Sequence, residues 1–179
     1  MSGQRDILAH LGNVPEDEIR GMRAPQIAAG SDEQFEMMKK AGFFYDNTLI
    51  ADPGPDGEPY WPQTLDYRVS WPCLDENCPQ SSFPGIWEIP INLFHGAQKI
   101  GAERRRSSMI RGAVQWNSSA SDIYNLLMDN FERAYYTNRA PYLLTLNADF
   151  LQLNEGKAAM QALKRFVYKS CCTFAEMRT

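Results

Sequence analysis

Short apolar segments alternate with amphipathic stretches along the chain, and this alternation constrains its fold more than any other feature. Apolar residues at helical spacing predict four helices, and short apolar runs bounded by turn residues predict strands between them. The predicted helices cover residues 4–11, 31–42, a stretch beginning near Ser121 and a stretch capped near Asn154; the predicted strands cover residues 43–45, 85–91 and 142–146. Strands that alternate with helices predict an α/β fold built on a parallel sheet or barrel.

Composition sets the class of protein before any motif is considered. The chain has 179 residues, of which 44% are hydrophobic and 12% aromatic, as expected for one globular domain with a sizeable core. Its formal net charge of −4 lacks the basic footprint of a nucleic-acid-binding protein, and the short basic run at 104–106 is expected in a solvated loop. No stretch approaches the roughly 18 consecutive apolar residues of a membrane span, and the N-terminus carries no apolar signal segment. We therefore expect no nucleic-acid partner and no membrane partner.

Two segments are expected to be irregular. Residues 53–59 are rich in proline and glycine and predict an exposed loop. Residues 92–120 are polar and lack a clear period, and a connection of that length is either functional or poorly ordered.

Arg23 is the first candidate site residue. It closes a short apolar stretch, and Pro25 follows two positions later. An arginine at the end of a strand has its guanidinium where the substrate pockets of α/β folds lie. Because a guanidinium binds carboxylates well, we expect a carboxylate partner nearby.

Cys73 and Cys78 close a short loop between two prolines. This spacing favours a local disulfide over half of a zinc site, because no second pair of similar spacing follows. A disulfide would indicate an oxidising compartment, and two reduced loop cysteines are the alternative. Further along, Asn117-Ser118-Ser119 fits the N-glycosylation acceptor pattern, which also arises often by chance.

Several motifs, taken in order, resemble the polysaccharide deacetylases of carbohydrate esterase family 4 (NodB homology), most closely the chitin deacetylases of insects and other invertebrates. The resemblance covers roughly residues 3–163. The matching segments are Gly21-Met22-Arg23-Ala24-Pro25, Gly42-Phe43-Phe44-Tyr45-Asp46, residues 61–67, the loop from Cys73 to Cys78 with residues 83–90, and residues 125–133 with 137–141.

For the fold, the resemblance implies a distorted (β/α) barrel. It implies an incomplete one here: residues 1–170 match a partial domain that lacks the opening strands and the closing strand, and residues 171–179 form a divergent tail. An incomplete barrel has unpaired strand edges, which favour association.

For the chemistry, the resemblance implies hydrolysis of the N-acetyl group of N-acetylglucosamine residues with a divalent metal bound by an Asp and two His. A second Asp acts as base, and a His on a late strand protonates the leaving amine. Arg23 matches the arginine that pairs with the base Asp. Asp46 matches an aspartate that supports the catalytic His, and a plain turn residue is an equal alternative. Asn147 stands at the position of that His; asparagine carries no titrating proton, and it is equally compatible with a polar residue ending a strand.

The resemblance also suggests residues that contact substrate. Aromatic rings pack on apolar faces such as those of sugar rings, so Trp61, after the 53–59 loop, is the first candidate. Trp87 lies inside an apolar strand and is expected in the core instead. The remaining candidates are Pro25, Asp66, Tyr142, Tyr67 and Trp71.

The histidines do not complete a metal site. The sequence has only His10 and His95, and neither stands in a pair spaced for two ligands. His10 is expected on a helix face and His95 in a loop without neighbouring ligand types. We therefore expect that this chain alone binds no metal, although zinc or another divalent metal is implied for the full-length family.

The functional expectation is a chitin deacetylase-like protein that is inactive as these 179 residues stand. The alternatives are a non-catalytic relative that binds or organises chitin, and a truncated gene product. The expected partner is chitin or another polymer of N-acetylglucosamine. The resemblance and the cysteine pair imply an extracellular location.

Overall fold

The computed structural model of the chain describes residues 2–54, 56–74, 77–100, 103–152 and 156–176. The chain divides into two compact units: unit 1 contains Met1–Asp52 and Tyr60–Ile91, and unit 2 contains Pro53–Pro59 and Asn92–Thr179. Each unit has its own cluster of buried hydrophobic side chains. The two units are therefore described one after the other.

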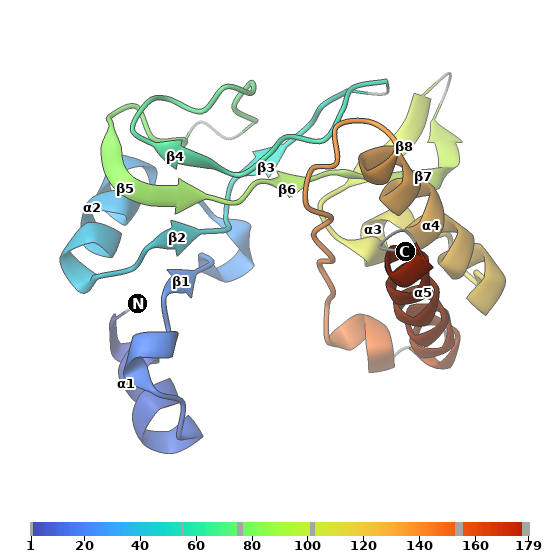
Figure 1. Cartoon of the computed structure of the whole chain (residues 1–179), viewed down its shortest axis with the longest axis horizontal. Coiled ribbons are helices and arrows are strands. Elements are labelled where there is room, and N and C mark those ends of the chain that lie inside the picture. Colours follow the sequence, from blue (N-terminus) through green and yellow to red (C-terminus); the bar gives the residue numbers. More distant parts are fainter. Residues whose placement is uncertain (1, 55, 75–76, 101–102, 153–155, 177–179) are drawn as a thin grey trace. The chain divides into compact units, whose positions relative to one another are not determined.

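Unit 1 is built on a four-stranded sheet with the strand order β1-β2-β5-β4 (Figure 1). β1 (Gly21–Met22), β2 (Tyr45–Asp46) and β5 (Phe83–Glu88) run parallel, and β4 (Gln63–Leu65) pairs antiparallel with β5. Glycine is required at position 21, because a Cβ there would overlap the ring of Tyr45 on the neighbouring strand. The predicted strand at 85–91 falls on β5 and β6 (Ile91–Asn92), whereas only Tyr45 of the predicted strand at 43–45 lies in β2.

The helix α2 (Ser31–Ala41) connects the parallel strands β1 and β2. Phe35 and Met38 of this helix are fully buried and pack in one cluster with Phe83 and Ile86 of β5. The rings of Phe35 and Phe83 have centroids 5.5 Å apart. The helix stops at Gly42, whose φ of 71° is in the left-handed region that favours glycine after a helix. The predicted helix at 31–42 is confirmed.

Other short elements complete unit 1. They are α1 (Ser2–Gly12), the 3-10 turns η1 (Glu16–Glu18) and η2 (Pro25–Ile27), and β3 (Ile50–Ala51), which pairs with β6. α1 confirms the helix predicted over residues 4–11. The Arg5 guanidinium of α1 lies 5.0 Å from the centroid of the Phe43 ring and forms an ion pair with Glu16 at 3.5 Å.

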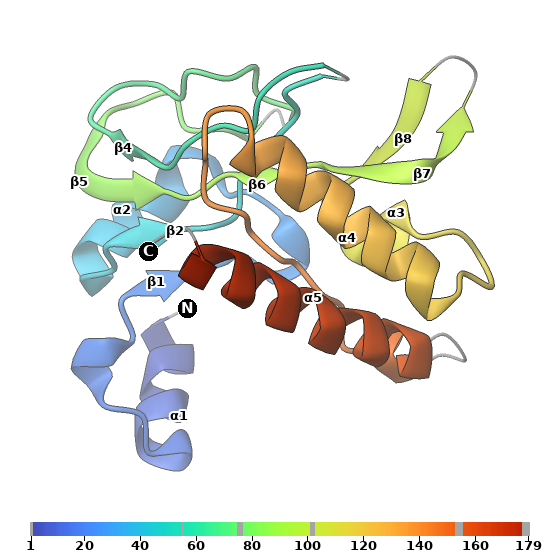
Figure 2. The same cartoon turned by 45° about the vertical axis from the view of Figure 1, so that its right-hand side comes forward.

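Unit 2 combines a β-hairpin with helices. Its elements are β7 (Phe94–Ile100), β8 (Glu103–Ser107), α3 (Ile110–Ala113), α4 (Ala120–Tyr135), η3 (Asp149–Gln152) and α5 (Gly156–Glu176). The helices α4 and α5 pack against each other and lie side by side in Figures 1 and 2. The side chain of Asn130 on α4 holds β7, because its Oδ1 accepts from His95 N at 2.8 Å and its Nδ2 donates to His95 O at 3.0 Å.

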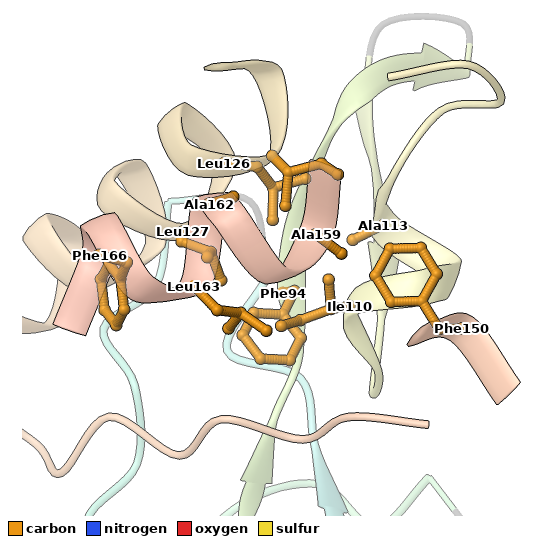
Figure 3. Close-up of a cluster of buried hydrophobic side chains, with 11 residues drawn as sticks. Phe94, Ile110, Ala113, Leu126, Leu127, Phe150, Ala159, Ala162, Leu163 and Phe166 are labelled. Atoms are coloured by element: carbon orange, nitrogen blue, oxygen red, sulfur yellow. The ribbon is translucent and has the colours of Figure 1, made fainter. Parts of the chain in front are cut away.

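The core of unit 2 forms between α4, α5 and the hairpin (Figure 3). Leu127 and Ala159 are fully buried, and Phe94 brings the hairpin into the cluster. The helix α4 begins at a capping box: Ser119 Oγ accepts from Asp122 N at 3.2 Å, and Asp122 Oδ2 accepts from Ser119 N at 2.9 Å. The helix predicted from near Ser121 is confirmed, whereas Asn154, the predicted cap of α5, lies outside the described residues.

Four sequence-based expectations are wrong in unit 2. The segment 92–120 contains the β7–β8 hairpin and α3 instead of an irregular connection. The basic run falls in β8 and His95 falls in β7, although both were expected in loops. Residues 142–146 form no strand. Strand pairing decides these cases: β7 and β8 supply each other with a ladder, for example between Phe94 and Ser107, whereas no described strand pairs with 142–146.

The fold class is confirmed as mixed α/β. Within the described ranges the sheets form no closed barrel, so the barrel type stays a prediction. Helix α5 runs through residue 170, where the sequence places the end of the partial domain, and continues to Glu176. No helix in the described part of the chain is long and apolar enough to cross a membrane.

Candidate functional site

Arg23 directly follows β1, as predicted, and meets the residues that follow β2. Because β1 and β2 are parallel neighbours, their carboxyl ends lie at one edge of the sheet, where α/β folds bind ligands. Arg23 Nε donates a hydrogen bond to the backbone oxygen of Asn47 at 2.9 Å, and Arg23 Nη2 donates to Asn47 Oδ1. Two bonds to one residue set the direction of the guanidinium.

The hydrogen-bond partner of Arg23 is therefore a carboxamide, not the expected carboxylate. Asn47 is held in turn, because its Nδ2 donates to Ile89 O at 2.5 Å and its backbone N donates to Met22 O at 3.0 Å. A carboxylate acts on Arg23 only through space: burial lowers the pKa of the guanidinium, and the charge of Asp46 opposes that shift. An acid does lie near Arg23, as expected from the sequence, but no sequence feature pointed to Asn47.

Asp46, the last residue of β2, is fully buried and accepts hydrogen bonds from Gln34 and Thr48. Its Oδ1 accepts from Gln34 Nε2 at 2.9 Å and from Thr48 Oγ1 at 2.8 Å, and its Oδ2 accepts from Thr48 N at 2.9 Å. Burial raises the pKa of Asp46, and the hydrogen bonds from Thr48 act against that rise. These bonds connect Asp46 to α2 and to the segment after β2, so its carboxylate also stabilises the local structure.

Glu88 forms a buried carboxyl pair with Asp46, and the sequence argument did not single it out. The two residues are partners in the register of β2 and β5, and both have 0% exposure. Glu88 Oε1 accepts from Leu49 N at 3.2 Å, while Oε2 is buried without a donor among the described residues. Burial, and next to it the charge of Asp46, raise the pKa of Glu88 well above its ordinary value. When Glu88 carries a proton and donates it in a hydrogen bond to Asp46, both buried carboxyl groups have a hydrogen-bond partner.

This polar cluster braces the chain around Arg23. Thr48 Oγ1 also accepts from Ala24 N at 2.9 Å, so the segment after β1 is bonded to the segment after β2. The cluster thus joins α2 and the carboxyl ends of β1, β2 and β5. Since Asp46 and Glu88 have no exposed surface, they act on a ligand only by holding Arg23 and its neighbours in place.

The backbone next to Pro25 is strained. Gln26 and Ile27 have φ values of 58° and 59°, in the left-handed region that residues other than glycine seldom adopt. Such residues cost on the order of 1–3 kcal/mol each and occur often at functional sites. Pro25 itself is exposed at the start of this turn. The strain supports a functional role for the segment that follows Arg23.

A pocket of about 320 Å³ opens beside Arg23. Its walls are mainly apolar, with Leu8, Met22 and Phe43 among them, and two arginines, Arg5 and Arg23, add positive charge. The described lining residues include no carboxylate. The pocket therefore suits a neutral or anionic group better than a cation.

Asp66 has a structural role, because its hydrogen bonds connect β4 and β5. Its Oδ2 accepts from Thr64 Oγ1 at 2.8 Å, its Oδ1 accepts from Gly85 N at 3.3 Å and its backbone oxygen accepts from Ser82 Oγ at 2.7 Å. These bonds connect the two strands around an irregularity in their register. Contact of Asp66 with substrate stays a prediction.

The tryptophans of unit 1 differ sharply in exposure. Trp61 is 53% exposed, as a sugar-contacting side chain would need to be. Trp71 is buried, and its ring packs 5.4 Å from that of Tyr60. Trp87 was expected in the core but is 48% exposed. Residues alternate between the faces of a strand, and since Ile86 and Glu88 point into the protein, Trp87 points out.

Tyr142 and Asn147 belong to unit 2. The Tyr142 ring packs against Phe94, Phe131 and Phe166 with centroid distances of 5.8–6.0 Å, and its hydroxyl donates to Leu127 O at 3.4 Å. Burial raises its pKa. Asn147 is partly buried, and its backbone oxygen accepts from Phe150 N at 3.2 Å at the start of η3. Tyr142 is thus a core residue, and its contact with substrate and the role of Asn147 stay predictions.

Within the residues that the structure describes, no side chains form the Asp and His cluster that the resemblance implies for the metal. In the described part of the chain, no group of three or more His, Cys, Asp or Glu side chains could hold a metal ion. His10 lies on α1, where its Nδ1 bonds to Asp6 O at 2.8 Å, and His95 lies on β7 of the other unit. The Asp46–Glu88 pair does not fit either, because N–H and O–H groups surround the Asp46 oxygens.

Cys73 and Cys78 form the predicted disulfide, with Cα atoms 6.3 Å apart. Cys78 is buried in the core of unit 1. Asp32 on α2 holds the chain just after it: Asp32 Oδ1 accepts from Gln80 N at 2.6 Å and from Ser81 N at 3.1 Å. Asp32, in the first turn of α2, thereby connects this helix to the segment after the disulfide.

Raising the pH is expected to destabilise unit 1 through Glu88. Its pKa is raised well above 4.5 in the folded state, so the stability it provides is complete below pH 4.5 and is lost as the pH rises through the folded-state pKa. Asp46, with a pKa raised from 3.8, contributes in the same direction. Asp32 affects stability at lower pH. Hydrogen bonds from Ser81 lower its pKa from 3.8 in the folded state, so the stability that Asp32 provides is present above pH 3.8 and is lost as the pH falls through the lowered pKa.

The variant Glu88→Gln tests this expectation. The amide stays neutral at every pH and can still donate towards Asp46, so the melting temperature of unit 1 should fall less with rising pH than in the parent. Thermal melts from pH 4 to pH 8 measure the difference, and Glu33→Gln, on the surface of α2, is the matched control. Parallel curves for Glu88→Gln and the parent would contradict a raised pKa at Glu88.

Comparison with known proteins gives two relatives and no matching protein-family model. Chitin deacetylase 1 of Bombyx mori is 29% identical over 176 residues, which cover 94% of this chain and 30% of that protein. Chitin deacetylase 8 of Bombyx mori is 26% identical over 170 residues, which cover 92% of this chain and 42% of that protein. The chain thus spans less than half the length of these curated relatives.

Proposed function

Because the chain is related to the chitin deacetylases, we propose that it is a chitin deacetylase-like protein whose ligand is chitin or another polymer of N-acetylglucosamine. The observation that carries the proposal is the likeness to two chitin deacetylases along 94% and 92% of the chain. The edge of the sheet at Arg23 adds support: a braced arginine, a strained turn and a pocket occur together there. In this proposal residues 1–170 are part of a larger deacetylase-type domain.

We also propose that these 179 residues alone do not hydrolyse the N-acetyl group of N-acetylglucosamine residues. The reaction implied by the resemblance needs a metal held by one Asp and two His, whereas His10 and His95 are on separate elements of separate units. Asn147 stands at the position of the general acid and carries no proton that titrates near neutral pH. Losing such a group costs about 100-fold to 10,000-fold in rate.

An acetate-release assay tests the catalytic part of the proposal. The chain is incubated with N-acetylated chitooligosaccharide and added zinc or cobalt, and acetate is measured. We expect no release above a protein-free sample with the same metal. Full-length Chitin deacetylase 1, run in parallel, shows that the assay works, and circular dichroism shows that the chain is folded. Turnover that depends on added metal would overturn this part.

A non-catalytic chitin-binding protein is the second candidate function. The exposed indole of Trp61 favours it, because a flat apolar ring can pack on a sugar ring without any catalytic group. Arg23 and the neighbouring pocket would then contribute to binding alone. The disulfide between Cys73 and Cys78 supports an extracellular location for either function.

Removing the Trp61 indole is expected to weaken retention on chitin. The variant Trp61→Ala should lose a large part of the bound fraction in a pull-down on chitin beads, since it removes the apolar surface of the indole, worth about 25 cal/mol per Å² buried on binding. Trp116→Ala is the matched control, because Trp116 is 77% exposed in unit 2 and has no proposed contact. Equal retention of both variants and the parent would count against Trp61.

A further inference from the structure

The turn between α3 and α4 presents a sequence motif that the proposed function does not use. Asn117-Ser118-Ser119 is the one place in the sequence where asparagine is followed, two positions later, by serine or threonine with no proline between them. This pattern is the acceptor for N-linked glycans in the secretory pathway. Because a three-residue pattern often arises by chance, a glycosylation site at Asn117 needs support from the structure.

The structure places Asn117 where a glycan can be accommodated. Asn117 is exposed and lies in a turn, with a φ of 63° in the left-handed region that asparagine tolerates better than most residues. The neighbouring Trp116 is 77% exposed. A bond from Ser118 Oγ to Gln115 O at 2.9 Å helps to hold the turn. A large hydrophilic group on Asn117 would therefore displace no core side chain.

A second observation concerns the compartment. Cys73 and Cys78 form a disulfide, and structural disulfides persist mainly in proteins that pass through an oxidising compartment. The machinery that attaches N-linked glycans acts on chains that enter the secretory pathway. The disulfide and the exposed acceptor turn thus point to the same route, independently of any activity on chitin.

We propose that Asn117 carries an N-linked glycan, transferred from a lipid-pyrophosphate-linked oligosaccharide while the chain is in the secretory pathway. In the transfer, Asn117 Nδ2 attacks the anomeric carbon of the first sugar and a new N–C bond forms. The bond from that carbon to the pyrophosphate oxygen breaks, and the lipid pyrophosphate leaves with the bonding electrons. One carboxamide proton is lost to a base of the transferase, so atoms and charge balance.

The structure also indicates when the transfer occurs. The hydroxyl of Ser119, which the acceptor motif requires, is engaged in the capping box of α4: it accepts from Asp122 N and bonds to Asp122 Oδ2 at 2.7 Å. In the folded protein this hydroxyl serves the helix and not the transferase. The glycan is therefore added before α4 closes its N-terminal cap, and the finished protein is a poor acceptor.

The test is secretion of the full chain from insect cells behind a cleavable signal sequence, followed by intact-mass analysis before and after treatment with peptide-N-glycosidase. The parent is expected to carry one glycan, and the enzyme is expected to leave an aspartate at position 117. Asn117→Gly should abolish the modification while suiting the positive φ. Ser118→Ala and Ser119→Thr preserve the acceptor pattern, and both are expected to keep the glycan.

Three results would overturn the proposal. One is an unmodified mass for the parent in cells that glycosylate a co-expressed reporter protein. Another is a glycan that persists in Asn117→Gly, because the modified residue would then be elsewhere. Loss of the glycan in Ser118→Ala would likewise contradict the acceptor pattern as its cause.

Discussion

Replacing Asp46 by alanine is expected to lower the free energy of unfolding of unit 1 by about 3 kcal/mol or more, because several buried donors lose their acceptor. The variant removes the acceptor of the Thr48 hydroxyl and of the Thr48 backbone N–H, and it leaves Gln34 Nε2 with only the long bond to Thr48 Oγ1 at 3.4 Å. Each of these donors is buried, and a buried donor without a partner costs about 1–3 kcal/mol. Glu88 also loses the group towards which its proton is donated.

Urea denaturation, read through hydrogen exchange of peptides from unit 1, measures this effect. Asp66→Ala is the matched control, because Asp66 also accepts hydrogen bonds in unit 1 but is exposed to water, which replaces them. Its effect should be much smaller. An Asp46→Ala variant as stable as Asp66→Ala would show that the cluster around Asp46 does not hold unit 1 together.

The second large effect is expected in unit 2. Truncating Leu127 to alanine should lower the free energy of unfolding of unit 2 by about 2–5 kcal/mol, since the loss combines buried apolar surface with a cavity. Leu127 has 0% exposure in the cluster between α4, α5 and the hairpin (Figure 3). Ala159 and Leu163 of α5 belong to the same cluster, so the cavity would open at the helix–helix contact.

Val167→Ala is the control for Leu127→Ala. Val167 lies on α5 but is 52% exposed, and alanine has the higher helix propensity, so little change or a slight gain is expected. Thermal unfolding followed by circular dichroism, with exchange of α4 and α5 peptides, compares the two variants. The importance of the α4–α5 contact would be refuted by a Leu127→Ala protein that melts together with Val167→Ala.

Some properties of Arg23 follow from the sequence alone, and others depend on the tertiary structure. The sequence places it after a strand and two positions before a proline, and both are local properties. Its partner Asn47 comes from the neighbouring strand, 24 positions away. The acid that acts on it, Asp46, is reached only because β1 and β2 are parallel and in register at Met22 and Asp46.

Glu88 shows why a buried polar cluster can be missed when only the sequence is known. In the sequence it is one charged residue inside the apolar segment 85–91, with no motif around it. Its elevated pKa needs two conditions that exist only in the folded protein, complete burial and the proximity of Asp46. The one available signal was that a glutamate seldom stands in a buried strand unless it has a partner.

By itself, the sequence determined what depends on neighbours along the chain. Helical spacing and end signals predicted the helices at 4–11, 31–42 and from near 121, the spacing of Cys73 and Cys78 predicted the disulfide, and ordered motifs indicated the relationship to chitin deacetylases. These properties are local because hydrophobic periodicity, turn residues and short loop closure involve only a few consecutive residues.

Tertiary structure alone decided what depends on pairing between distant segments. It formed a hairpin in the polar segment 92–107, left residues 142–146 without a strand, turned Trp87 outwards and joined Asp46 to Glu88. All four features have the same physical reason: they depend on contacts between segments that are distant in the sequence. A strand needs the backbone groups of a partner, and burial of a side chain depends on what the rest of the chain places over it.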